Sequence, residues 1–104
     1  MRVLWQTRAR NSFQEIANYV KCQFGMKSRR EYVEKVHQQE KLLRKSPYIG
    51  SIDPLFADRA ATYRSVIIKG LSKMVYRVEE NTIHIVAFWD TRREPKAQAN
   101  KVEE

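Results

Sequence analysis

The spacing of apolar residues changes once along this chain, and that change restricts the fold more than any single motif does. Between residues 8 and 46 the apolar residues recur three or four positions apart, the period of an amphipathic helix. After residue 60 apolar and polar residues alternate, the period of a strand with one buried face. Helical sequence followed by extended sequence favours an α+β fold, with the helices on one side of a sheet.

Two helices are predicted in the first half of the chain. The first runs from about Arg8 to Phe24 and ends at Gly25. Its apolar stripe consists of Phe13, Ile16, Ala17, Val20 and Phe24. The stretch SRRE at residues 28–31 is typical of a capping box that opens the second helix. This helix ends near Ser46, because a residue before proline disfavours helical geometry. Its inward-facing residues are Tyr32, Val33, Val36 and Leu43.

The remaining elements are short strands joined by loops. A first strand covers residues 2–6, and a loop rich in Pro, Gly and Asp covers residues 47–59. The other strands are predicted at residues 60–69, 73–79 and 82–89. The order is therefore β-α-α-β-β-β, with a helical hairpin packed on one face of a twisted antiparallel sheet. We expect one domain over residues 1–93 and a polar C-terminal tail over residues 94–104.

Charge and cysteine content narrow the class of protein. The 104 residues carry a formal charge of +8, which favours an anionic partner such as nucleic acid or an acidic protein segment. The alternative is that the charges only keep exposed helices soluble. Cys22 is the one cysteine, which excludes a disulfide framework or a cysteine metal site and indicates a reducing compartment. No apolar run is long enough to span a membrane or to act in a secretion signal, so we expect a cytoplasmic protein.

Alternation in the strand at residues 73–79 predicts which side chains face the helices. Met74, Tyr76 and Val78 are expected inside, and Lys73 and Arg77 outside. The same rule applied to the neighbouring strands predicts an open, helix-free face that binds an anionic target. Its predicted members, including two at the rim, are Arg64, Lys73, Arg77, His84, Phe88, Arg92 and Arg93.

Structural roles remain open for several of these residues. His84 is more typical of a packing or edge residue than of a catalyst, and Arg77 has carboxylates nearby at Glu79 and Glu80. Asp90 could accept hydrogen bonds from the arginines that follow it, which would make residues 90–93 a structural latch. The sequence has no Gly-rich phosphate loop, metal-ligand spacing, paired catalytic carboxylates or nucleophile elbow. We therefore expect no cofactor and no metal.

Several segments, in order, resemble the RelE/ParE toxin superfamily of bacterial type II toxin-antitoxin modules, often described as plasmid stabilisation proteins. They are VLWQTRARNSFQEIANYV, LLRKSPYIG, YRSVIIKG, KMVYRVEENTIHIVAFWD and TRREP. The resemblance covers about residues 3 to 96. It implies a small α+β toxin that arrests growth and is neutralised by a cognate antitoxin, whose acidic or amphipathic tail would cover the open face or the helical hairpin.

The superfamily has two branches, and the resemblance leaves both open. Members that cleave ribosome-bound mRNA use basic residues to hold phosphate, and Arg92, Lys73 and Arg64 match or fall near those positions, so they would be catalytic in an mRNA interferase. Such members usually also have a late Tyr or His, whereas REPKAQANKVEE follows Arg92 here. ParE-like members instead poison DNA gyrase without chemistry, and the long helices slightly favour this branch. A basic nucleic-acid-binding domain without toxicity is a third possibility.

Overall fold

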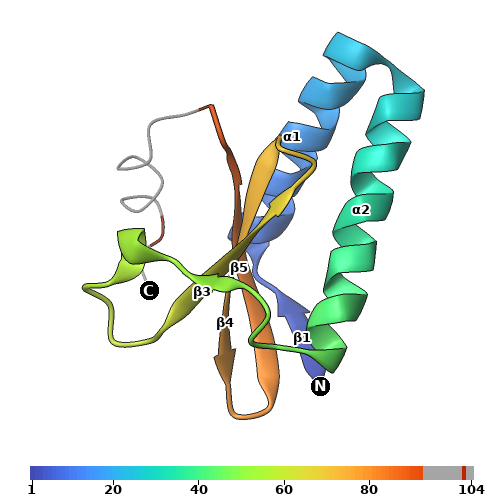
Figure 1. The fold of residues 1–104 in the computed structure, drawn as a ribbon. Coiled ribbons are helices and arrows are strands. Elements are labelled where there is room, and N and C mark those ends of the chain that lie inside the picture. The colour runs from blue at the N-terminus through green and yellow to red at the C-terminus, as the bar shows by residue number, and fades with distance from the viewer. Residues whose placement is uncertain (93–101, 103–104) are drawn as a thin grey trace.

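A helical hairpin covers one face of a five-stranded sheet in the computed structural model, which describes residues 1–92 and 102 (Figure 1). The sheet order is β1-β5-β4-β3-β2. The elements are β1 (Arg2–Trp5), α1 (Thr7–Phe24), α2 (Met26–Lys45), β2 (Ser51–Ile52), the 3₁₀ helix η1 (Pro54–Phe56), β3 (Tyr63–Ile68), β4 (Ser72–Glu79) and β5 (Thr82–Asp90). This confirms the predicted α+β fold. The sheet is mixed, however, because β1 runs parallel to β5, and β2 is an additional edge strand.

A single residue joins the two helices. Gly25 has a φ of +94°, a conformation that favours glycine, and it both ends α1 and precedes α2. The predicted capping box is wrong, because α2 starts at Met26 and no side chain caps it. Glu31 therefore lies inside the helix, where its carboxylate pairs with the Lys69 ammonium group at 3.1 Å.

The main core lies between the helical hairpin and the sheet. It contains the predicted inward residues of α1 up to Val20, together with Tyr32, Val36 and Leu43 of α2. The rings of Trp5, Phe13, Tyr32 and Phe88 pack together, with centroids 5.1 to 5.8 Å apart. Phe24 was predicted to complete the buried stripe, but its side chain is 60% exposed because the hairpin continues past the sheet.

The face of the sheet opposite the helices has a core of its own, so the prediction of an open face is wrong. Buried residues of this second cluster are Phe56, Tyr63, Val75, Val86, Ala87 and Val102. The segment between β2 and β3, which includes η1, folds over the sheet and supplies Phe56. Of the predicted tail, only Val102 belongs to the described residues, and it is 1% exposed.

Two features of the sheet, a bulge in β5 and the pairing register of β3, explain why side chains were assigned to the wrong face. Met74 and Tyr76 face the helices as predicted. The pairing of β4 with β5 shifts by one residue between Val75, which pairs with Ala87, and Tyr76, which pairs with Ile85. β5 therefore contains an extra residue, and the Phe88 side chain faces the helices. Opposite residues in antiparallel strands point to the same face. Arg64 pairs with Tyr76, so Arg64 also lies on the helix side.

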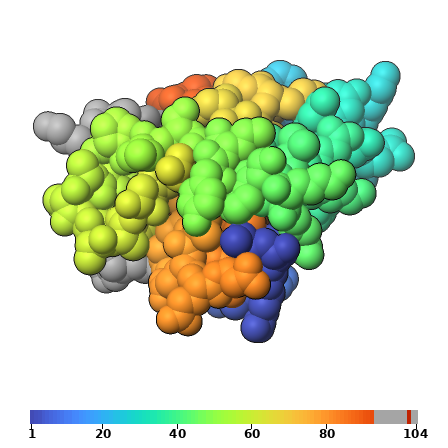
Figure 2. Space-filling model, turned by 60° about the horizontal axis from the view of Figure 1, so that its bottom comes forward, coloured from blue at the N-terminus to red at the C-terminus, as the bar shows by residue number. Residues whose placement is uncertain are grey.

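A loop across the end of the sheet completes the fold. It follows α2, and in Figure 2 this green segment lies beside the orange turn between β4 and β5 and the blue N-terminus. The phenolic oxygen of Tyr76 accepts a hydrogen bond from the Gly50 backbone N–H at 2.9 Å, which fixes the loop to the core. Tyr48 and Ile52, on either side of Gly50, are each 62% exposed. No helix in residues 1–92 is long and apolar enough to cross a membrane.

Candidate functional site: the groove between α1 and β5

The second half of β5 has no strand on one side, and α1 lies there instead. Pairing with β1 ends where Trp5 meets Ile85. Farther along β5, the Phe88 backbone N–H donates to the Ser12 hydroxyl of α1 at 2.9 Å, and that hydroxyl donates to the Arg8 carbonyl at 3.0 Å. A helical side chain thus satisfies a strand-edge donor that would otherwise face a partner strand.

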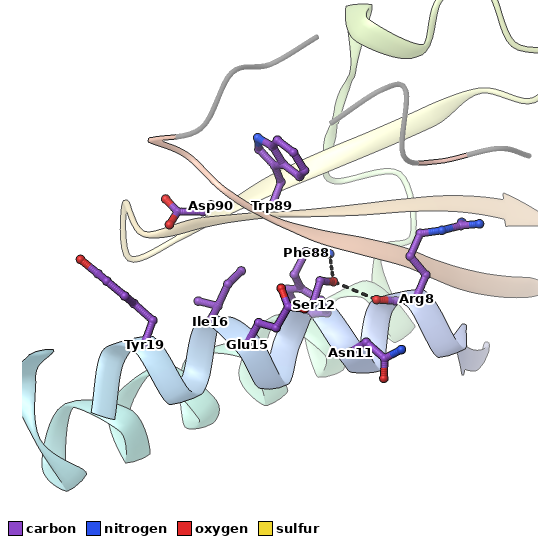
Figure 3. A pocket seen from close by; sticks show the side chains of 9 residues that line it. All are labelled: Arg8, Asn11, Ser12, Glu15, Ile16, Tyr19, Phe88, Trp89 and Asp90. Atoms are coloured by element: carbon purple, nitrogen blue, oxygen red, sulfur yellow. Dashed lines mark hydrogen bonds between the residues drawn. The ribbon is translucent and has the colours of Figure 1, made fainter. Parts of the chain in front are cut away.

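A groove of about 490 Å³ opens between these two elements (Figure 3). Its lining combines apolar and polar side chains, namely Arg8, Asn11, Ser12, Glu15, Ile16, Tyr19, Phe88, Trp89 and Asp90. Figure 3 shows Phe88 directed toward α1 and Trp89 directed away from it. Apolar groups beside carboxylates and an arginine suit an amphipathic protein segment.

Arg92 lies at the Tyr19 end of the groove. Its Nε donates to Asp90 Oδ1 at 2.9 Å, and its Nη2 contacts Asp90 Oδ2 at 2.5 Å. Its Nη1 donates to the Tyr19 hydroxyl, and the guanidinium carbon lies 4.3 Å from the Tyr19 ring centroid. Hydrogen bonds to Asp90 and then Tyr19 raise the pKa of the Arg92 guanidinium. The predicted latch is confirmed for Arg92, while Arg93 lies outside the described residues.

Lys73 lies on the other face of the sheet, where it holds the segment that covers the second core. Its Nζ is 2.7 Å from Asp53 Oδ2, and the two side chains are 15% and 3% exposed. Asp53 Oδ1 also accepts a hydrogen bond from the Leu55 backbone N–H at 3.0 Å. This ion pair therefore has a structural role that alternation could not reveal.

Arg64 serves the loop after α2. Its Nη1 donates to the Gly50 carbonyl at 2.9 Å and to the Tyr48 carbonyl at 3.3 Å. The guanidinium carbon lies 5.2 Å from the Tyr48 ring centroid. Arg64 therefore holds the loop against the edge of the sheet, whereas it was predicted to lie on an open, target-binding face.

Among the predicted site residues that the structure describes, Arg77 and His84 form an adjacent pair. Arg77 and His84 are opposite one another on β4 and β5, on the face away from the helices. Arg77 forms an ion pair with Glu79, as its structural interpretation proposed. Phe88 is 2% exposed and belongs to the main core, so its predicted outward position is wrong.

Comparison with known proteins decides the family. Residues 3–95 match the family described as the ParE toxin of type II toxin-antitoxin system, parDE. The chain belongs to the ParE toxin family. No curated protein matches the sequence significantly.

Two solved structures share the ParE fold of this chain. The chromosomal ParDE TA system from P. aeruginosa is 18% identical, with a TM-score of 0.70 over 86% of this chain and 95% of that chain. The YoeB/ParE toxin from Agrobacterium tumefaciens is 19% identical, with a TM-score of 0.61 over 86% of this chain and 98% of that chain. The predicted resemblance to the RelE/ParE superfamily is thereby confirmed.

The cations that would be catalytic in an mRNA interferase are dispersed in this ParE chain. Arg64 and Lys73 lie on opposite faces of the sheet, and Arg92 lies beside α1. Each has partners within the chain. Within residues 1–92 and 102, no cluster of three or more His, Cys, Asp or Glu residues could hold a metal ion.

The sequence also contains a signal for the ParE groove that the alternation of the strands does not show. Four polar or aromatic residues of α1 recur at spacings of four, three and four, beside the apolar stripe. They are Arg8, Ser12, Glu15 and Tyr19. Such a second stripe places side chains along one flank of a helix. Which strand the flank would meet depends on the sheet order, which short-range patterns do not give.

Proposed function

We propose that this ParE-family chain is a growth-inhibiting cytoplasmic toxin that poisons DNA gyrase by binding it, and that a cognate antitoxin neutralises it. The observation that carries the choice of gyrase is the dispersal of Arg64, Lys73 and Arg92 over separate parts of the fold. Poisoning by binding needs a shaped surface and no catalytic group.

Cleavage of mRNA makes a more demanding requirement. The 2′-hydroxyl of RNA would attack its own phosphate, and cations would have to surround that one phosphate to stabilise the developing charge. Lys73 would have to leave Asp53, a carboxylate whose side chain is only 3% exposed. Breaking such a buried pair is costly. The ion pairs of Lys73 and Arg92 therefore support the hypothesis of a gyrase poison over that of an mRNA interferase.

The groove between α1 and β5 is our proposed site for the antitoxin. Ile16 and Phe88 form its largely buried apolar floor, and polar side chains, including that of Asn11, also line it. A chain of charge +8 also attracts an acidic partner from a distance. An amphipathic antitoxin segment with acidic residues fits both properties.

Induction of the chain without its antitoxin in a bacterial host tests the proposal. We expect growth arrest, double-strand breaks in the chromosome and an SOS response, while translated mRNA stays intact. Rapid loss of translated mRNA with an intact chromosome would instead support the mRNA interferase. Unaffected growth would contradict the toxin function altogether and favour a basic domain without toxicity.

A further inference from the structure

The tip of the helical hairpin, residues 21–31, contributes no buried residue to either core. Along α1 the last buried residue is Val20, and along α2 the first is Tyr32. No residue between them is buried. Figure 1 shows this part of the hairpin extending away from the sheet. The fold therefore leaves the tip available for contact with another molecule.

Two large apolar side chains stand at the apex of this tip. Phe24 is 60% exposed and Met26 is 49% exposed, on either side of Gly25. Aromatic and methionine side chains are enriched where protein partners bury surface. Exposed singly they would need no explanation, but here they flank the same turn.

Cations outnumber acids around the apex. Residues 21–30 include Lys21, Lys27, Arg29 and Arg30 and no Asp or Glu. None of these four forms an ion pair with another residue in the part of the chain that the structure describes. The first acid beyond them, Glu31, is paired with Lys69. The tip thus presents a net positive charge around an apolar centre.

The tip is also held in one shape. Gly25 donates its backbone N–H to the Lys21 carbonyl at 2.9 Å, and its own carbonyl accepts from the Arg29 N–H at 3.1 Å. Helical hydrogen bonds thus continue up to the connecting residue on both sides. A surface that is already ordered loses little conformational entropy when it binds.

We propose that the hairpin tip is the element that docks on the target protein, with Phe24 and Met26 entering an apolar recess on an acidic surface. This inference rests on the proposed function, a toxin that acts by binding. A protein fits the tip better than nucleic acid does, because the apex that would meet a phosphate backbone is apolar and the cations stand around it.

Charge-insertion variants test this inference, with the double variant Phe24→Glu/Met26→Glu compared with Leu42→Glu. Leu42 is 49% exposed, as Met26 is, but lies near the other end of α2, so it controls for an added charge on the hairpin. We expect the double variant to lose growth inhibition on induction, and its purified form to bind gyrase at least about tenfold more weakly. Leu42→Glu should behave as the unaltered chain, and thermal unfolding and antitoxin affinity should be preserved in both.

The possible outcomes distinguish a failure of the tip inference from a failure of the proposed function. If the unaltered chain arrests growth and the double variant does so equally, the tip inference is overturned while the toxin function stands. If the unaltered chain neither arrests growth nor binds gyrase, the proposed function fails and the inference fails with it. A loss of toxicity matched by an equal loss of affinity for a bare DNA duplex would overturn docking on protein.

Cys22 provides an independent readout because it is exposed and lies within the tip. Modification of its thiol by a maleimide would be followed in the free chain, with gyrase and with the antitoxin. Docking through the tip predicts that gyrase slows the reaction at least about tenfold, as burial of the tip residues requires. Equal modification rates in the free chain and with bound gyrase would overturn the proposal.

Discussion

At the scale of single residues, the Asp53–Lys73 ion pair has the clearest measurable consequence. Asp53→Ala would leave the Lys73 ammonium group, 15% exposed, without its carboxylate and the Leu55 N–H without its acceptor. We expect the free energy of unfolding to fall by about 2–4 kcal/mol, since a partly buried charge loses its partner. Chemical denaturation of the purified chain measures this loss.

Asp58→Ala is the matched control. The Asp58 side chain is 83% exposed and pairs with Arg59 at 3.5 Å in the same segment. An exposed pair of this kind contributes about 0–1 kcal/mol. Equal destabilisation by the two variants would contradict a special role for Asp53 in holding the segment over the second core.

Ser12 also joins two elements through a single side chain. Ser12→Ala removes the acceptor of the Phe88 N–H beside the groove. Unfolding free energy should fall by about 1–2 kcal/mol, because a backbone donor loses its partner. Hydrogen exchange at the Phe88 amide should accelerate more than the global destabilisation explains. An unchanged exchange rate would show that the Ser12 contact does not protect the edge of β5.

At the scale of elements, Tyr32 links α2 to β4 and makes their packing dependent on pH. Its hydroxyl lies 2.9 Å from the Ser72 hydroxyl, and its side chain is fully buried. Burial, aided by the charge of Asp90 and opposed by the Ser72 hydrogen bond, raises the pKa of Tyr32 from 10.0 to about 12. The unfolded chain therefore loses this proton at a lower pH than the folded chain does.

The stability contributed by this shift is fully present below pH 10.0 and disappears as the pH rises toward about 12. Two pKa units correspond to about 2–3 kcal/mol. The free energy of unfolding should be measured from about pH 9 to about pH 11.5, a range that includes the pKa of tyrosine in the unfolded chain. It should fall more steeply with pH for the unaltered chain than for Tyr32→Phe. Parallel profiles would refute the assignment to Tyr32.

The helices were predictable because their signals are local, and the faces of the strands were not. The apolar residues of α1 recur at helical spacing, which placed its start one residue after the observed Thr7, and Gly25 marks its end. The outward assignment of Phe88 failed because one extra residue in β5 reverses the alternation. Arg64 was misplaced because its face depends on the register of β3 against β4, and the turn between these strands sets that register.

At the scale of the whole molecule, the contacts that disperse the predicted site are long-range. Lys73 meets a carboxylate supplied by the segment after β2, and Arg92 meets a tyrosine of α1. Neither pairing follows from spacing within one element. Family membership could be predicted nevertheless, because the order of several weak motifs along residues 3 to 96 was informative together. The net charge of +8 also stands, and Lys21, Lys27, Arg29 and Arg30 place part of it on the hairpin tip.

The most direct test uses the purified chain with purified DNA gyrase and, in parallel, with ribosomes engaged on mRNA. If the ParE-family chain poisons by binding, supercoiling by gyrase should stop and cleaved DNA should accumulate, while the mRNA remains full length. Added antitoxin should reverse the effect on gyrase. Normal supercoiling together with cut mRNA on the ribosome would contradict a gyrase poison and restore the mRNA interferase.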